Sequence, residues 1–165
     1  MATPTTLPAT FVAGDVLTAA QQNDLRGGFR ILQFKSASTT TPQTISTSTY
    51  TDLTSFSISI TPQATTNKIL CVWSGKGDKS AGNASNGINF RFVRTATTIA
   101  TWQNNLFTNS LLRLINPMTF MFLDSPNTTS AITYKCQAAN VFNGAEVTFQ
   151  QASDVGEMYL LEISL

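Results

Sequence analysis

The chain has 165 residues, enough for one domain with its own core but cramped for two. Charged residues make up 12% of the sequence, against about 25% in ordinary globular domains. The net charge is +1 and the charges are scattered singly, which argues against nucleic-acid binding. There is no histidine, the commonest general base and metal ligand. Neither a membrane-spanning apolar run nor a secretory signal is evident, so we expect no membrane insertion.

The N-terminal segment, residues 1–28, differs from the rest of the chain. Residues 1–13 are rich in Thr, Pro and Ala and predict an extended arm. Residues 15–28 predict the one short helix, because Asp15 is a suitable N-cap and two glycines end the pattern. The apolar side of this helix is thin, so it needs a partner surface. We therefore predict a docking arm and short helix over 1–28.

Residues 29–165 predict a separate all-β domain. Ser and Thr make up about a quarter of the chain, and β-branched Thr suits a half-exposed strand face. Apolar and polar residues alternate in short runs between turn signals, which is typical of an antiparallel β-sandwich or jelly roll. About nine strands are predicted, and 103–114 stays open between loop and strand. The predicted ranges, ten when the adjoining 44–53 and 53–60 are counted separately, are 29–36, 44–53, 53–60, 68–75, 87–95, 97–102, 115–124, 131–140, 146–150 and 156–165.

Strand parity predicts the core. In 53–60, Phe56, Ile58 and Ile60 point one way and the intervening serines the other. The run 68–75 is apolar at both parities, which predicts a central strand covered on both sides. The two cysteines, Cys71 and Cys136, lie in apolar strands and are expected to be buried, reduced thiols, with a disulfide as the alternative.

The stretch 75–87 is rich in Gly, Asn and Ser and predicts a flexible loop. It lacks the Gly-Lys-Ser/Thr ending of a phosphate-binding loop. We expect it to face outward and to offer a contact surface. The candidate contact residues are Lys76, Asp78, Lys79, Asn83 and Asn86.

The sequence offers no recognisable catalytic constellation. Without histidine there is no base for a nucleophile triad, and no spacing favours a Ser-Lys pair. Most carboxylates stand beside turn residues, where they are better explained as solvated turn groups than as a glycosidase pair. The aromatic residues are better explained as core than as a sugar-binding platform, although Trp102 and Phe107 could face a neighbouring subunit. We predict a non-enzymatic protein with no metal, no cofactor and no catalytic residues.

The stretch 7–33 resembles the start of small virion proteins of tailed bacteriophages, in which F-x-A-G-x-x-L-T-A-A-Q-x-N-x-L-R precedes a β domain. The stretches 48–76 and 120–137 and the closing run 156–165 resemble that β domain. The matching residues of the motif are Phe11, Ala13, Gly14, Leu17, Thr18, Ala19, Ala20, Gln21, Asn23, Leu25 and Arg26. Residues 103–114 depart from the pattern.

The resemblance implies a structural protein on the virion surface, made in the bacterial cytoplasm and forming a homo-oligomer, expected to be a trimer. Its expected partners are phage capsid or tail proteins. A capsid decoration or cement protein fits the small size best. The alternatives are a short head or tail fibre that binds a host glycan or protein, a small glycan hydrolase and, more remotely, a generic carbohydrate-binding module. The expected docking residues are Leu7, Phe11, Val12, Val16, Leu17, Leu25 and Arg26.

Overall fold

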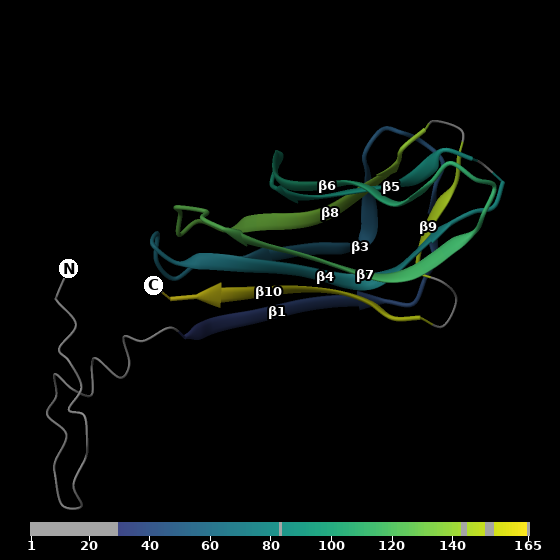
Figure 1. Ribbon diagram of the computed structural model, residues 1–165. Helices are drawn as coiled ribbons and strands as arrows, with labels where there is room; N and C mark the ends of the chain where they lie inside the picture. Colours follow the sequence, from purple (N-terminus) through teal and green to yellow (C-terminus); the bar gives the residue numbers. More distant parts are fainter. Residues whose placement is uncertain (1–29, 83, 143–144, 151–153, 165) are drawn as a thin grey trace, which may run out of the picture.

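The computed structural model describes residues 30–164 except 83, 143–144 and 151–153. In these residues the chain forms strands and no helix, which confirms the predicted all-β class (Figure 1). The ten strands are β1 (Ile31–Thr39), β2 (Gln43–Ile45), β3 (Thr51–Ile60), β4 (Lys68–Lys79), β5 (Asn86–Arg94), β6 (Thr97–Thr108), β7 (Leu114–Asp124), β8 (Ile132–Asn140), β9 (Val147–Phe149) and β10 (Gly156–Ile163).

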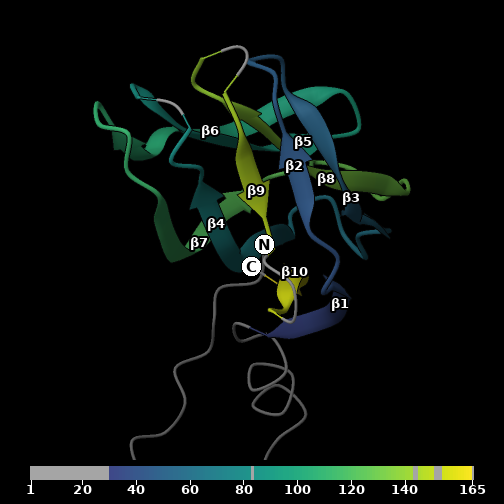
Figure 2. The same ribbon diagram turned by 90° about the vertical axis from the view of Figure 1, so that its right-hand side faces the viewer.

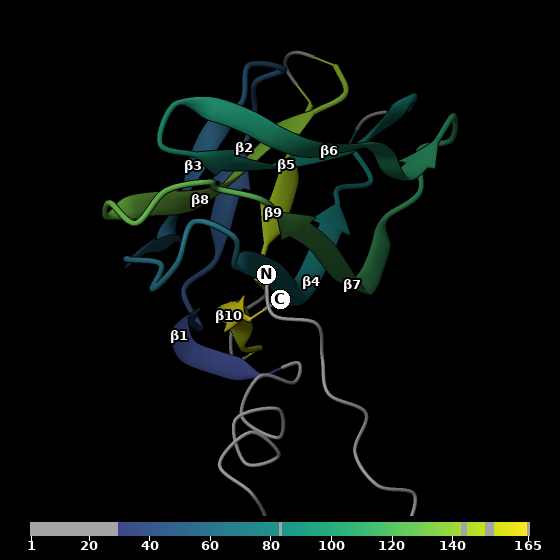
Figure 3. The same cartoon turned by 90° about the vertical axis from the view of Figure 1, so that its left-hand side faces the viewer.

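Two antiparallel sheets lie face to face, as the end-on views show (Figures 2 and 3). Sheet A has the order β1-β10-β4-β9-β2, with β7 on the other edge of β4, and sheet B has the order β3-β8-β5-β6. Strands β10 and β9 follow one another along the same edge of β4. Taking β1 with β2 and β9 with β10 as interrupted strands leaves eight strands in jelly-roll order, in agreement with the sequence-based fold prediction.

Alternate residues of both sheets meet in one aromatic core. Trp73 of β4 is fully buried and its ring packs against Phe56, Phe90, Phe120 and Phe149, at centroid distances of 6.0, 5.2, 5.8 and 5.7 Å. These rings come from both sheets, so Trp73 joins the two layers. The predicted inward residues of β3 are buried and the serines between them are exposed, because neighbouring side chains of a strand point to opposite faces.

Two buried carboxylates at the edge of this core are paired. The Asp124 carboxylate accepts hydrogen bonds from Arg94 Nη1 at 2.8 Å and from Tyr134 Oη at 2.7 Å. Burial, together with this hydrogen bond, raises the pKa of Tyr134 well above its usual value. The fully buried Glu162 accepts hydrogen bonds from Gln33, Asn67 and the Gln63 backbone, each at 2.6 Å. These groups fix the end of the sandwich at which β3 turns into β4 and β7 turns into β8.

Two predicted ranges are wrong, and the structure assigns a third range that the sequence left open. The range 44–53 is not one polar strand but the short β2, a bend and the start of β3. The range 75–87 is not a loop, because β4 continues to Lys79 and β5 begins at Asn86. The ambiguous 103–114 divides into the end of β6, a turn and the start of β7. Asn104 and Leu106 have φ of 57° and 51°, a left-handed conformation that breaks the side-chain alternation of β6.

Candidate interaction surface

The outer surface of sheet A carries apolar side chains. In β4, Ile69, Cys71 and Trp73 point into the core, so Leu70 and Val72 point outward by alternation. Both outward residues are partly exposed. The prediction that 68–75 is covered on both sides is therefore wrong for the described residues: only the inner side is packed against a second sheet.

The strand registers align these outward residues into two rows across the sheet. Phe34 pairs with Leu161, Leu161 with Leu70, and Leu70 with Leu123; Tyr159 pairs with Val72, and Val72 with Met121. We call these seven residues the apolar face. Its members on the edge strands are the most exposed, with Phe34 at 57%, Leu123 at 50% and Met121 at 61%. The rings of Phe34 and Tyr159 stack at 5.6 Å, which joins the two rows.

The next row along the strands is polar. Ser38, Glu157, Ser74 and Thr119 lie opposite one another in register, and the Ser74 and Thr119 hydroxyls are 3.2 Å apart. We call these four residues the polar row. A hydrogen bond to Glu157, with some burial, raises the pKa of the Tyr159 hydroxyl. The hydrogen bond between Tyr159 and Glu157 therefore connects the apolar face to the polar row.

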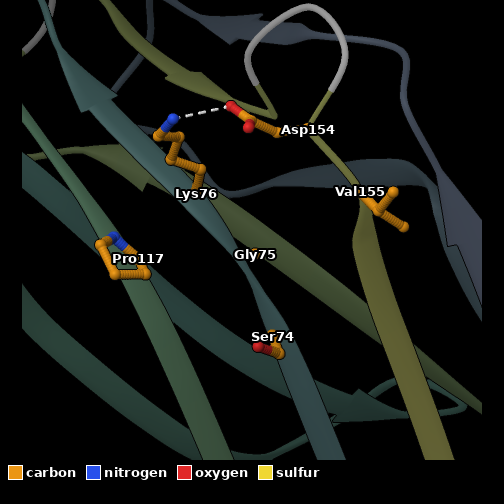
Figure 4. Close-up of a pocket in the computed structure, with 6 residues that line it drawn as sticks. All are labelled: Ser74, Gly75, Lys76, Pro117, Asp154 and Val155. Carbon is orange, nitrogen blue, oxygen red and sulfur yellow. Dashed lines mark hydrogen bonds and ion pairs between the residues drawn. The ribbon is translucent and has the colours of Figure 1, made fainter.

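Beyond the polar row the sheet is hollowed (Figure 4). The hollow has a volume of about 320 Å³ and its lining residues are Ser74, Gly75, Lys76, Pro117, Asp154 and Val155. Figure 4 shows Lys76 and Asp154 facing each other across it, with an ion pair of 2.9 Å. Because the two charges neutralise each other and both are partly exposed to water, the hollow presents little net field.

The outer surface of sheet B is polar. Asp52 accepts hydrogen bonds from Gln137 at 2.6 Å and from Lys135 at 2.9 Å, and Gln137 accepts one from Arg91 at 2.7 Å. The Gln137 hydrogen bond, followed by that of Lys135, lowers the pKa of Asp52. Arg91 also lies 4.0 Å from the centroid of the Tyr50 ring. This surface satisfies its own polar groups and leaves no large apolar patch.

The apolar face lies in the half of sheet A closest to Arg30, the first described residue. Ile31 at the start of β1 pairs with Ile163 at the end of β10, and Figure 1 shows both strand ends at the same end of the sandwich. The described part of the chain therefore begins beside the apolar face. The opposite end of the sandwich carries the loops between β4 and β5 and between β6 and β7 (Figures 1 and 2). Exposed apolar residues in or next to these distal loops are Phe107, Leu111 and Leu112, and Phe142 lies at the same end.

Most of the predicted contact loop is not a loop. Lys79 is fully buried and its Nζ donates hydrogen bonds to the Ser110 and Leu112 carbonyls at 3.1 and 2.9 Å. Asp78 is buried and forms an ion pair with Arg113 at 2.6 Å, and Asn86 is fully buried. Of the other two, Lys76 is half-buried in β4 and Asn83 lies outside the described residues. The prediction of an outward contact surface is wrong for Asp78, Lys79 and Asn86, because these side chains anchor neighbouring segments.

The two cysteines are confirmed as buried thiols without a disulfide. Desolvation by burial is the main cause that raises the pKa of both Cys71 and Cys136, so both thiols stay protonated.

Trp102 and Phe107, whose positions the sequence left open, differ: Trp102 packs against the core rings and Phe107 is exposed. The predicted docking residues all lie outside the described residues.

The described residues contain no group of three or more Cys, Asp or Glu side chains placed to hold a metal ion. They also contain no helix with the length and hydrophobicity needed to cross a membrane. Comparison of the chain with protein-family models found no match, and comparison with curated protein sequences found none that is significant.

The apolar face was missed in the sequence although a signal for it was present. Runs such as Met121–Leu123 and Tyr159–Leu161 are apolar at both parities, as is the run at the start of β4. Such runs indicate a strand with two buried faces. Within the described residues no second layer packs on the outer face of sheet A. Strands that are apolar at both parities therefore indicate here a surface that another chain could cover.

Proposed function

We propose that this protein is a non-enzymatic structural component of a tailed-phage virion, a capsid decoration or cement protein that docks through residues 1–28. The observation that carries the proposal is where the described domain starts. The described chain begins at Arg30 beside the apolar face, and the segment that resembles the start of phage virion proteins precedes this point in the sequence. The distal loops then face away from the particle.

The physical argument is one of buried surface. A cement protein stabilises a shell by covering neighbouring subunits, which requires a contact area larger than one small sandwich end provides. An arm that orders on binding extends this area, at the cost of its conformational entropy. The aliphatic and aromatic residues of the N-terminal segment, among them Phe11, Val12 and Leu17, would supply its apolar contacts. The protein would be made in the bacterial cytoplasm and reside on the virion surface.

The test is to delete residues 1–28 and to measure binding to particles that lack the protein. We expect the truncated chain to lose at least tenfold in occupancy, measured by quantitative gel analysis of purified particles and by imaging. A matched control carries Leu111→Ser and Leu112→Ser at the distal end and should decorate normally. Both variants must give the same β-type circular dichroism as the full chain. Normal occupancy of the truncated chain would refute docking through this segment.

A second function, a short head or tail fibre, is favoured by one observation. Phe107, Leu111, Leu112 and Phe142 are exposed at 40, 65, 58 and 52%, at the end away from residue 30. Exposed aromatic and aliphatic side chains at a projecting tip are suited to contact a host glycan or protein. Binding of the full chain to a host-glycan array or to host cells, lost in the Leu111→Ser, Leu112→Ser variant, would favour the fibre. Unchanged binding in that variant would argue against it.

A further inference from the structure

We propose that the apolar face of sheet A is the surface through which copies of this chain bind one another, side by side about an axis parallel to the strands. This inference concerns the isolated protein and does not depend on a virion role. It is carried by the rows that cross β1, β10, β4 and β7. No second sheet of the described chain covers these rows.

The size of the face supports a protein interface. Three well exposed side chains and four partly exposed ones leave on the order of 500 Å² of apolar surface in water, near the upper end for a single chain. A stable interface buries roughly 800 Å² on each partner. The face supplies more than half of that area, and the polar row beside it adds to the remainder.

The chemistry of the face favours a second copy of the same chain. The two apolar rows contain no charged residue, and the whole chain has a net charge of only +1, so two copies repel each other little. Ser38, Ser74 and Thr119 in the polar row have hydroxyls that both donate and accept, so like can meet like. No partner of opposite charge is needed.

The order of the rows along the strands fixes the orientation. Apolar rows lie near residue 30 and the polar row lies farther along, so only copies at the same level place the polar row against the polar row as well as apolar against apolar. Rotation about an axis parallel to the strands keeps the copies level. It also leaves every N-terminal segment at one end of the assembly, and it closes into a ring of identical contacts such as the predicted trimer.

The first experiment measures the mass of the full chain in solution by sedimentation or light scattering. We expect the wild type to form an oligomer, and the variant Met121→Glu, Leu123→Glu to have the mass of a single chain. The matched control is Thr101→Glu, Gln103→Glu, which adds the same charges to β6, the edge strand of sheet B, and should keep the wild-type mass. Both variants should retain the wild-type circular dichroism, because all four side chains are exposed.

Three outcomes would overturn the proposal: a monomeric wild type over the micromolar range, an unchanged mass in the Met121→Glu, Leu123→Glu variant, or equal dissociation of the control. A monomeric wild type whose particle binding is lost in the same variant would assign the face to a capsid or tail protein instead. The deletion of residues 1–28 tests docking separately, so the two proposals can fail independently.

The second experiment tests the orientation. Thr65 lies in the exposed turn between β3 and β4, at the end of the sandwich nearest residue 30. A spin label on Thr65→Cys reports the distance between copies, and the two native thiols are buried and remain unlabelled. The apolar face is centred about six residues from Thr65, so copies in opposite orientations would separate the labels by roughly 30–40 Å along the strands. Label distances clearly shorter than about 30 Å are expected, and longer ones would overturn the side-by-side arrangement.

Discussion

The outer surfaces of the two sheets differ, although both sheets contribute alternate residues to the same core. On sheet B, Asp52, Gln137, Arg91 and Lys135 hydrogen-bond to one another and leave few groups without a partner. On sheet A, the corresponding central positions hold side chains such as Leu70 and Val72. In both sheets the strands pair through backbone hydrogen bonds, whichever side chains lie on the outer surface. The difference therefore reflects what each surface meets: water for sheet B and, by our proposal, protein for sheet A.

The largest expected effect comes from Trp73, which lies beneath both surfaces. Replacing Trp73 by Ala should lower the free energy of unfolding by about 3–5 kcal/mol, because it leaves a cavity between the sheets. Urea denaturation followed by circular dichroism measures the change. Trp73→Phe, which keeps most of the ring volume, serves as the control and should lose less. Equal losses in the two variants would contradict a role in filling the space between the layers.

The next effect concerns Asp124, which faces inward from β7. Asp124→Ala should cost about 3 kcal/mol, since it leaves Arg94 and Tyr134 without their shared acceptor. The matched exposed carboxylate is Asp52 on the outer side of sheet B. Thermal or urea unfolding of both variants compares them directly. If Asp52→Ala were as damaging as Asp124→Ala, burial would not be what distinguishes the two carboxylates.

The effect at Asp52 should be smaller and should depend on pH. Because folding lowers the pKa of Asp52, its contribution is present above the unfolded pKa of about 4 and is lost as the pH falls through the folded pKa. Asp52→Asn should cost at most about 1 kcal/mol at pH 7, since the group is well exposed. The difference from wild type should shrink toward pH 3. A difference that grows on acidification would have the wrong sign for a lowered pKa.

The smallest effect on the single chain is expected on the apolar face. Met121→Ser with Leu123→Ser should change the unfolding free energy of the monomer by no more than about 0.5 kcal/mol, because both side chains are already exposed. The measurement is made on dilute protein, where association adds no stability. At high concentration the wild type should gain stability and the variant should not. A loss as large as that of Trp73→Ala would show that these side chains are buried in the free chain.

Alternation made much of the fold predictable. The serines and apolar residues of 53–60, and the aromatic residues of β5, identified the core faces directly, because a strand reverses its side chains at every residue. The same rule failed in β6, where Asn104 and Leu106 adopt left-handed backbone conformations that no local pattern announces. Local composition was misleading at Lys79. The Gly-, Asn- and Ser-rich stretch around it indicated a loop, but its ammonium group is held by backbone carbonyls of the β6–β7 turn.

The sequence by itself determined the class of fold, the inward residues of 53–60 and the placement of Cys71 and Cys136 in apolar strands, because these follow from local periodicity and composition. Only the tertiary structure decided which outward residues come together. Phe34, Leu161, Leu70 and Leu123 lie far apart in the chain and become neighbours through strand order and register. Strand order and register depend on pairing between residues far apart in the chain, which a side-chain pattern of period two does not specify. The apolar face is therefore visible only in the tertiary structure.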